Sequence, residues 1–308
     1  MPNEQPPIRP SDASAITRRY LDSILLELRL VDAAVPSTSF ELFGKTFDTP
    51  IMMPAFSHLE LFIKEREDGM GDYARAAKAL NAVNFVGMTT LEEYARIAAI
   101  GVPTVRIVKP YADKDQIFAR FEQAEATGAL AVGMDIDHSF GRNGTPDTVH
   151  GNLMAPQSLD DLKAYVRSTR LPFVAKGVLS VRDAVKCAEA GVGAILISHH
   201  HGRVPFAIPP LMVLPEIKKA VGDSVRIFVD CSIASGADVF KALALGADAA
   251  AVGRAIMEPL RTDGQAGVEA FVRGMNDQLA MLMAYTGCRT LADLEPSLLW
   301  IDGKPAGC

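Results

Sequence analysis

Short apolar runs alternate with amphipathic stretches along most of the chain, from about residue 50 onward. The runs show no strict polar–apolar alternation, which is typical of parallel strands that are covered on both faces. The runs are residues 50–56, 82–88, 103–109, 129–136, 172–178, 194–200, 226–232 and 249–255. Segments with helical periodicity lie between them, at residues 71–82, 91–101, 114–128, 159–170, 181–191, 211–222 and 236–246. Eight strand–helix units in series predict an α/β fold, a single-domain (β/α)8 TIM barrel, with an open doubly wound sheet as the alternative.

The chain before the first unit differs from the rest. Residues 1–15 are polar and proline-rich, which predicts a loosely attached arm, and residues 16–32 mix helical and extended signals. We therefore expect an N-terminal arm and lead-in segment over residues 1–36 and a barrel domain over residues 37–308. The polar loop at 137–157 is unusually long, and on a barrel it would lie on the active face.

Composition narrows the class of protein. The chain has 308 residues, 49% hydrophobic and 22% charged, with a net charge of −6. No Lys/Arg run stands out, so we expect neither nucleic-acid nor membrane-surface binding. No apolar secretory region or membrane-spanning stretch is present, and the four cysteines form no CxxC pair. These features predict a cytoplasmic protein that binds a small molecule and has no zinc site and no disulfide framework.

Polar residues gather where the predicted strands end. These residues are Arg106, Asp135, Asp137, Lys176, Ser198, Asp230, Cys231, Ser232, Gly253 and Arg254. On a barrel, the carboxyl ends of the strands form the active face. Lys176 would place a cation at the barrel mouth, where it stabilises anionic charge on a cofactor or intermediate.

Three consecutive histidines, His199 to His201, follow the sixth run. Consecutive side chains point in different directions, so three adjacent imidazoles rarely converge on one metal ion, and we expect no metal site. The pattern favours one histidine as a general base, with structural or pocket-lining neighbours. Arg203, three residues after His200, could bind a carboxylate through two parallel hydrogen bonds.

The residues after the last two strands suggest a phosphate site. Small residues follow Asp230 and open a helix, and Gly253 and Arg254 end the last strand. Barrels commonly bind phosphate with the loops after strands seven and eight, through backbone N–H groups at a helix N-terminus.

Two motifs carry a resemblance to a known family. The stretch LPFVAKGVLSVRDAVKCAEAGVGAILISHHHGR and the stretch IFVDCSIASGADVFKALALGADAAAVGRAIM resemble the FMN-dependent α-hydroxy-acid oxidase/dehydrogenase family. Glycolate oxidase and lactate oxidase belong to this family. The likeness spans roughly residues 37–295 and is strongest over 171–256.

The resemblance implies an FMN-dependent oxidoreductase that oxidises a 2-hydroxy acid and assembles as a homo-oligomer, a tetramer in the family. His200 would take the hydroxyl proton while hydride moves to flavin N5, and Arg203 would bind the substrate carboxylate. Lys176 would contact the N1/C2 edge of the flavin. Further residues implied at the cofactor are Pro54, Ala55, Arg106, Asp135, Ser198, Asp230, Cys231, Ser232, Gly253 and Arg254.

The chain departs from the family pattern at several positions. On the third strand the family carries Gln and Tyr, which we align with Arg106 and Val108, and on the fourth strand Asp135 replaces a Thr. A phosphate-binding Arg aligns with Ala234. Arg142 aligns with an arginine of the substrate loop. Two alternatives therefore stay open: a flavin-free phosphate-binding isomerase or lyase, and an FMN protein whose substrate is not a hydroxy acid.

Overall fold

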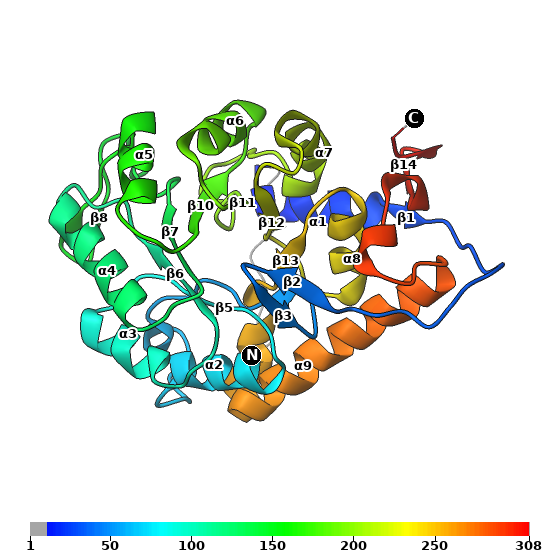
Figure 1. Cartoon of the computed structure of the whole chain (residues 1–308), viewed down its shortest axis with the longest axis horizontal. Coiled ribbons are helices and arrows are strands. Elements are labelled where there is room, and N and C mark those ends of the chain that lie inside the picture. The colour runs from blue at the N-terminus through cyan, green and yellow to red at the C-terminus, as the bar shows by residue number, and fades with distance from the viewer. Residues whose placement is uncertain (1–10, 308) are drawn as a thin grey trace, which may run out of the picture.

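The apolar runs form one parallel sheet that curves into a barrel. A computed structural model describes residues 11–307, and its eight-stranded sheet has the order β4-β13-β12-β11-β10-β7-β6-β5 (Figure 1). The strands are β4 (Ile51–Met52), β5 (Asn84–Val86), β6 (Thr104–Val108), β7 (Ala131–Asp135), β10 (Phe173–Val178), β11 (Ala194–Ile197), β12 (Arg226–Val229) and β13 (Ala249–Ala251). The N–H of Met53 after β4 donates to the carbonyl of Val83 before β5 at 2.9 Å, which joins the two ends of the sheet. The predicted TIM barrel is confirmed.

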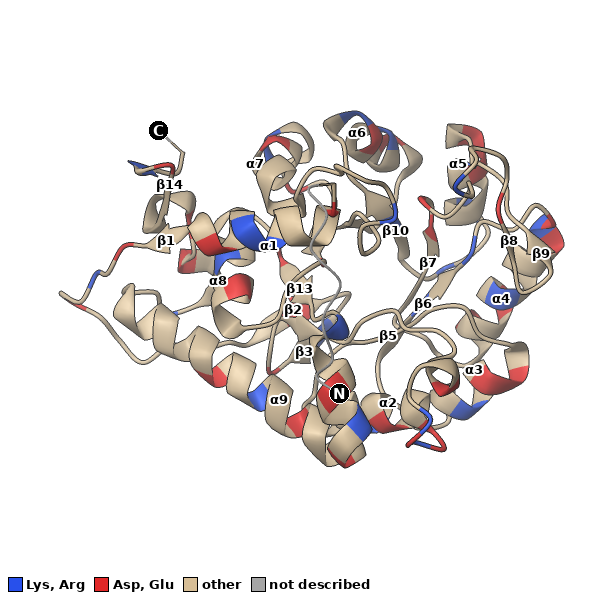
Figure 2. Ribbon diagram, turned by 180° about the vertical axis from the view of Figure 1, so that it is seen from behind, with Lys and Arg blue, Asp and Glu red and all other residues tan. Residues whose placement is uncertain are grey.

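Helices cover the outside of the barrel. They are α2 (Gly69–Ala79), α3 (Leu91–Ala98), α4 (Lys114–Ala126), α5 (Leu159–Arg167), α6 (Val181–Ala190), α7 (Pro210–Val221), α8 (Gly236–Ala244) and α9 (Met257–Tyr285). The bounds of the first seven fall within three residues of the predicted helical segments. Figure 2 shows acidic and basic residues side by side on outer helices such as α6 and α9. Among residues 11–307, no helix is long and apolar enough to cross a membrane.

Side chains of each strand alternate between the barrel interior and the helix layer. Val105 and Ile107 of β6 pack inside with Phe228, whereas Val108 belongs to the cluster beneath the helices. The hairpin of β2 (Phe40–Leu42) and β3 (Lys45–Phe47) adds its aromatic side chains to the inner cluster. This hairpin contacts Gly193, just before β11, and so closes the amino-terminal end of the barrel. The carboxyl ends of the strands are therefore the end available for a site.

The N-terminal segment is attached more firmly than its composition indicates. Helix α1 (Ala13–Ser23) begins after the N-cap Asp12 and buries Ala13, Thr17 and Leu21, and it lies against α7. The expectation of a loose arm is therefore wrong for residues 13–15, because an apolar helix face outweighs the polar composition; residues 1–10 lie outside the described residues. The division at residue 36 stays a prediction.

The remaining elements are short. Strand β1 (Leu25–Leu26) pairs with β14 (Leu299–Ile301), which also pairs with β15 (Lys304–Pro305). The loop at 137–157 contains a small hairpin of β8 (Thr148–Val149) and β9 (Asn152–Leu153). Short 3-10 helices are η1 (Leu59–Leu61), η2 (Arg254–Ile256), η3 (Leu291–Asp293) and η4 (Pro296–Leu298).

Candidate active site

A cavity of about 460 Å³ opens at the carboxyl ends of the strands. It brings together most of the residues that the sequence singled out. Those that line it are Pro54, Ala55, Lys176, His200, Asp230, Cys231, Ser232, Gly253 and Arg254. Phe56 and Phe62, from the segment after β4, add an apolar wall. A cavity of this size with a few converging polar groups is typical of a cofactor or substrate site.

His200 and Asp137 form a partly buried pair at one side of the cavity. His200 Nδ1 lies 2.9 Å from Asp137 Oδ1 and 3.2 Å from Oδ2. Because a carboxylate only accepts hydrogen bonds, Nδ1 carries the proton and Nε2 is left as the basic nitrogen. Burial alone would raise the pKa of Asp137, but the hydrogen bond to His200 and nearby Lys176 lower it. The pair can therefore act as an oriented general base.

The glycine after Lys176 makes room for this pair. Gly177 has φ +93°, and a Cβ at this position would lie 2.3 Å from the carboxyl carbon of Asp137. A larger residue would displace the carboxylate that orients His200. The Lys-Gly dipeptide is therefore required by packing as well as by the chemistry of the lysine.

Lys176 belongs to a second buried cluster. Its Nζ donates to Asp135 Oδ1 at 2.8 Å, and Lys109 Nζ donates to Oδ2 of the same carboxylate at 2.7 Å. All three side chains are less than a tenth exposed. Burial alone would raise the pKa of Asp135, but Lys109 and Lys176 hold it well below its usual range. Burial would lower the pKa of Lys176, but Asp135, Asp230 and Asp137 together raise it, so this lysine stays charged.

The long loop connects this cluster with Arg203. Lys109 Nζ lies 2.9 Å from His138 Nδ1, and His138 Nε2 lies 3.2 Å from Asp147 Oδ2. Arg203 donates one amino group, Nη2, to Asp147 at 2.7 Å and to the carbonyl of Phe140. Burial and the charge on Lys109 lower the pKa of His138 to about 4, so its ring is neutral at pH 7. Arg203 is thereby fixed by one edge, with Nε and Nη1 left for another acceptor.

The opposite end of the cavity suits a phosphate group. Arg254 lines this end, beside the segment 231–234 that leads into α8. Burial lowers the pKa of Arg254, but the ordinary pKa of an arginine is so high that the guanidinium remains a cation at neutral pH. The backbone there is strained: Cys231 has φ 72° and Ser232 has φ 59°, a region that non-glycine residues rarely adopt. Strain of this kind concentrates at functional sites.

Helix α1 braces the loops around this end. Arg18 donates to both carboxylate oxygens of Asp238, at 2.7 and 3.0 Å, and to the carbonyl of Ser232 at 3.0 Å. His199, which is buried, accepts from the N–H of Gly202 and lies 2.9 Å from the hydroxyl of Thr17. His199 thus makes structural contacts and His201 lines the cavity, in line with what the sequence predicted for the neighbours of His200.

Two predicted site residues lie elsewhere. Arg106 is 1% exposed, but its guanidinium lies in the helix layer, 3.8 Å from the ring centre of Tyr94 and hydrogen-bonded to Gln123. Val108 packs in the same layer. The assignment of both residues to the cofactor or substrate is wrong, because the strand register was read one residue too early. The inward positions are Ile107 and Lys109, since a shift of one residue moves a side chain to the other face.

Four other predicted residues, Ser198, Arg142, Asp135 and Arg203, are not among those that line the cavity. Ser198, buried at the end of β11, accepts from the N–H of His200 at 2.9 Å and so helps to shape the turn. Arg142 is exposed on the long loop, and the structure does not bring it to the cavity. Asp135 is likewise behind Lys176, as described above.

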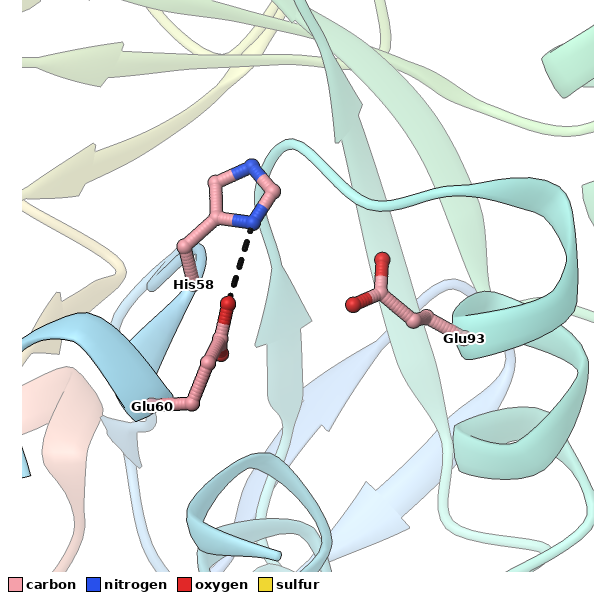
Figure 3. A group of neighbouring side chains, drawn as sticks. All are labelled: His58, Glu60 and Glu93. Atoms are coloured by element: carbon pink, nitrogen blue, oxygen red, sulfur yellow. Dashed lines mark ion pairs between the residues drawn. The ribbon is translucent and has the colours of Figure 1, made fainter. Parts of the chain in front are cut away.

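Two groups of side chains have the spacing of metal ligands. Asp135, Asp137 and His200 form one, but Lys109 and Lys176 already occupy Asp135 and would repel a cation. The other group, His58, Glu60 and Glu93, lies on the rim (Figure 3). Glu93 there caps α3 by accepting from the N–H of Thr90, and Glu60 is half exposed. The expectation of no metal site stays a prediction.

Sequence reasoning placed Asp137 at a strand end but gave it no role, and it left Lys109 out of the predicted site. Asp137 lies two residues after Asp135, so strand alternation places both carboxylates inside the barrel. Lys109 is the last residue of the third apolar run, where a charged residue is unusual. Counting inward positions back from the strand end would have identified it.

Comparison with known proteins gives a consistent result. A family model described as FMN-dependent dehydrogenase matches residues 12–159 and 141–301. An L-lactate oxidase from Roseobacter sp. is 38% identical over 159 residues, which is 51% of this chain and 43% of that protein. A 2-hydroxyacid oxidase from Dictyostelium discoideum is 29% identical and covers 91% of this chain and 80% of its own length. A crystal structure of mandelate oxidase superposes with a TM-score of 0.83 at 27% identity, over 95% of this chain and 90% of that one.

Proposed function

Because the chain belongs to the FMN-dependent dehydrogenase family, we propose that it oxidises a small 2-hydroxy acid to the corresponding 2-oxo acid. FMN, when bound, supplies the hydride acceptor. The observation that carries the proposal is that His200, which is hydrogen-bonded to Asp137, lines the same cavity as Lys176. The flavin-free isomerase or lyase alternative is set aside by the family assignment.

The donor groups of the cavity fit FMN. Arg254 and the backbone N–H groups that open α8 would hold the phosphate, and Asp230, Cys231 and Ser232 line the path to it. Lys176 would meet the flavin edge that gains negative charge on reduction, and Pro54 and Ala55 would lie beneath the ring. The position of Ala234 has no cation of its own, so a single arginine serves the phosphate there.

The polar residues would bind and deprotonate the substrate. Arg203 would bind its carboxylate through Nε and Nη1, since Asp147 and Phe140 occupy Nη2. His200 Nε2 would then accept the proton of the 2-hydroxyl group. Asp137 would hold Nδ1–H in place and stabilise the imidazolium that forms. These roles follow from the contacts of the side chains: Asp137 holds His200 Nδ1, and Asp147 and Phe140 hold Arg203 Nη2.

The relatives support the substrate class. Curated relatives that cover most of this chain are named for L-lactate and 2-hydroxy acids, and the similar solved structures are mandelate oxidases. These names describe those proteins. For this chain they define the compounds to test first, namely glycolate, L-lactate and mandelate.

The test is the visible spectrum of the purified protein before and after anaerobic addition of each acid. We expect a flavin spectrum that bleaches with at least one acid, at a rate that His200→Ala abolishes and that His150→Ala, an exposed loop histidine, leaves unchanged. Bleaching that persists in His200→Ala would refute the assignment of the base. No bleaching with any acid would refute the substrate class.

A second candidate is an FMN enzyme with a different substrate. Two observations favour it: Arg203 already contacts a carboxylate of the protein, and Lys109 takes the inward strand position beside the reacting groups. This candidate predicts a flavin that no 2-hydroxy acid reduces.

Assembly and location are also proposals. We infer a homo-oligomer from the family resemblance, to be tested by light scattering after size-exclusion chromatography. Cytoplasmic location is inferred from composition, to be tested by cell fractionation.

A further inference from the structure

Asp135 lies between two lysines on neighbouring strands. In the sheet, β7 lies between β6 and β10, and Lys176 is directly opposite Asp135 in the register. Val108, the last residue of β6, is opposite Met134, so the next residue, Lys109, comes beside Asp135. Each carboxylate oxygen accepts from a different lysine, at 2.7 and 2.8 Å. The arrangement is a buried bridge with the carboxylate at its centre.

Only one end of this bridge reaches the cavity. Lys176 lines the cavity, whereas Asp135 and Lys109 lie behind it. Lys109 is 6% exposed and its remaining close partner is neutral His138. Lys109 is therefore placed to act on the cofactor only through Asp135 and Lys176.

The carboxylates around Lys176 indicate how Lys109 affects the charge of Lys176. Three carboxylates, Asp135, Asp137 and Asp230, act on Lys176, and His200 pairs with one of them. Without Lys109, Asp135 would attract Lys176 alone and its negative charge would offset the cation at the flavin edge. With Lys109 in place, the charge of Asp135 is shared between two ammonium groups.

We propose that Lys109 is a positioning residue that, through Asp135, keeps Lys176 directed at the flavin and keeps its positive charge effective there. This inference rests on the proposed function only in requiring that FMN binds beside Lys176. It assigns a positioning role to Lys109 and Asp135, and this role follows from their contacts in this chain.

The proposal predicts opposite effects for the two partners. Lys109→Met removes a cation and should stabilise the oxidised over the reduced flavin, by about tenfold, given the strength of unit charges a few ångströms apart in a protein. Asp135→Asn removes an anion and should shift the balance the other way by a similar factor. The double variant Lys109→Met/Asp135→Asn keeps the net charge of the wild type and should return close to it.

The measurement is the midpoint potential of the bound FMN, for which a tenfold change corresponds to about 30 mV in a two-electron couple. Lys219→Met, at an exposed lysine, is the matched control and should give the wild-type potential. Lys109→Met leaves a buried carboxylate with one partner, so its folding is checked by circular dichroism. The double variant, which has no unpaired charge, keeps the test available if the single variant is unstable.

The possible outcomes distinguish a failure of this inference from a failure of the proposed function. Shifts of the same sign in both single variants, or no return towards the wild type in the double variant, would show a merely structural role and overturn this inference alone. A wild-type protein that binds no FMN would overturn the proposed function, and this inference with it. Opposite shifts that cancel in the double variant support it.

Discussion

Replacing Asp137 with asparagine removes one charge from the pair that orients His200 while keeping the shape of the side chain. The carboxylate oxygen lies 2.9 Å from His200 Nδ1. Two unit charges at this distance interact by about 6 kcal/mol at an effective dielectric constant of about 20. The imidazolium that forms when His200 takes a proton would lose this attraction.

Solvent reduces that figure. The His200 side chain is 26% exposed and that of Asp137 is 18% exposed, so we take about half of it, roughly 3 kcal/mol. At about 1.4 kcal/mol for each factor of ten, Asp137→Asn should slow flavin reduction about 100-fold. The affinity for the substrate should change little, since Arg203 binds the carboxylate in the proposed site.

The assay is the anaerobic rate of flavin bleaching in a stopped-flow instrument, over a range of substrate concentrations. Asp160→Asn, at an exposed position in the first turn of α5, is the matched control and should react at the wild-type rate. If Asp137→Asn reduces the flavin within threefold of the wild-type rate, the carboxylate does not assist the base and the reasoning is wrong. Loss of FMN from the variant would show a structural role instead.

Three further predictions concern stability and cofactor binding. Ser232→Gly should raise the free energy of unfolding by about 1 kcal/mol in urea denaturation, because Ser232 has φ 59°; Ser232→Ala keeps the strain and should give no gain. Burial lowers the pKa of His138 to about 4, so between pH 6.5 and 4 the unfolded chain binds more protons than the folded one, and stability falls as the pH falls through this window. His138→Gln should remove up to about 3 kcal/mol of that fall. An equal pH dependence of the free energy of unfolding in both proteins would contradict the burial argument. Arg18→Met should weaken FMN binding about tenfold and lower the free energy of unfolding by about 2 kcal/mol, because it leaves the buried Asp238 without its guanidinium partner. Unchanged values in fluorescence titration and urea denaturation would show that α1 does not brace the phosphate loop.

The barrel could be predicted from the sequence because each of its units repeats the same signal. Every apolar run that was identified contains a strand of the sheet, and each of the seven helical segments overlaps a helix. Helix α1 was not predicted, since its apolar positions lie beside polar and proline-rich sequence. What buries them is the barrel itself, through α7, and this contact joins residues that are far apart in the chain.

The residues of the candidate site could be predicted only where their place in the strand–helix pattern puts them at the carboxyl end of the barrel. Lys176 lies in the last half of β10, and His200 and Arg254 each come three residues after a strand, so their expected positions put all three in the lining of the cavity. Arg106 was misplaced because a cation within an apolar run was assumed to face the site. In the structure it contacts Tyr94 and Gln123 in the helix layer, and no local pattern reveals such partners.

The departures from the family pattern are connected by contacts, and this argues for a working site rather than a decaying one. Asp135, which replaces a threonine, is matched by Lys109 on the neighbouring strand. The loop that carries the strained Cys231 and Ser232 is held by Arg18 from α1, through the carbonyl of Ser232. Unpaired changes at these buried positions would each cost stability, because a lone buried charge or a strained turn has nothing to offset it. The paired arrangement keeps a cation at each end of the cavity, Lys176 at one and Arg254 at the other. A protein that had lost its cofactor would have no reason to retain both cations in these positions.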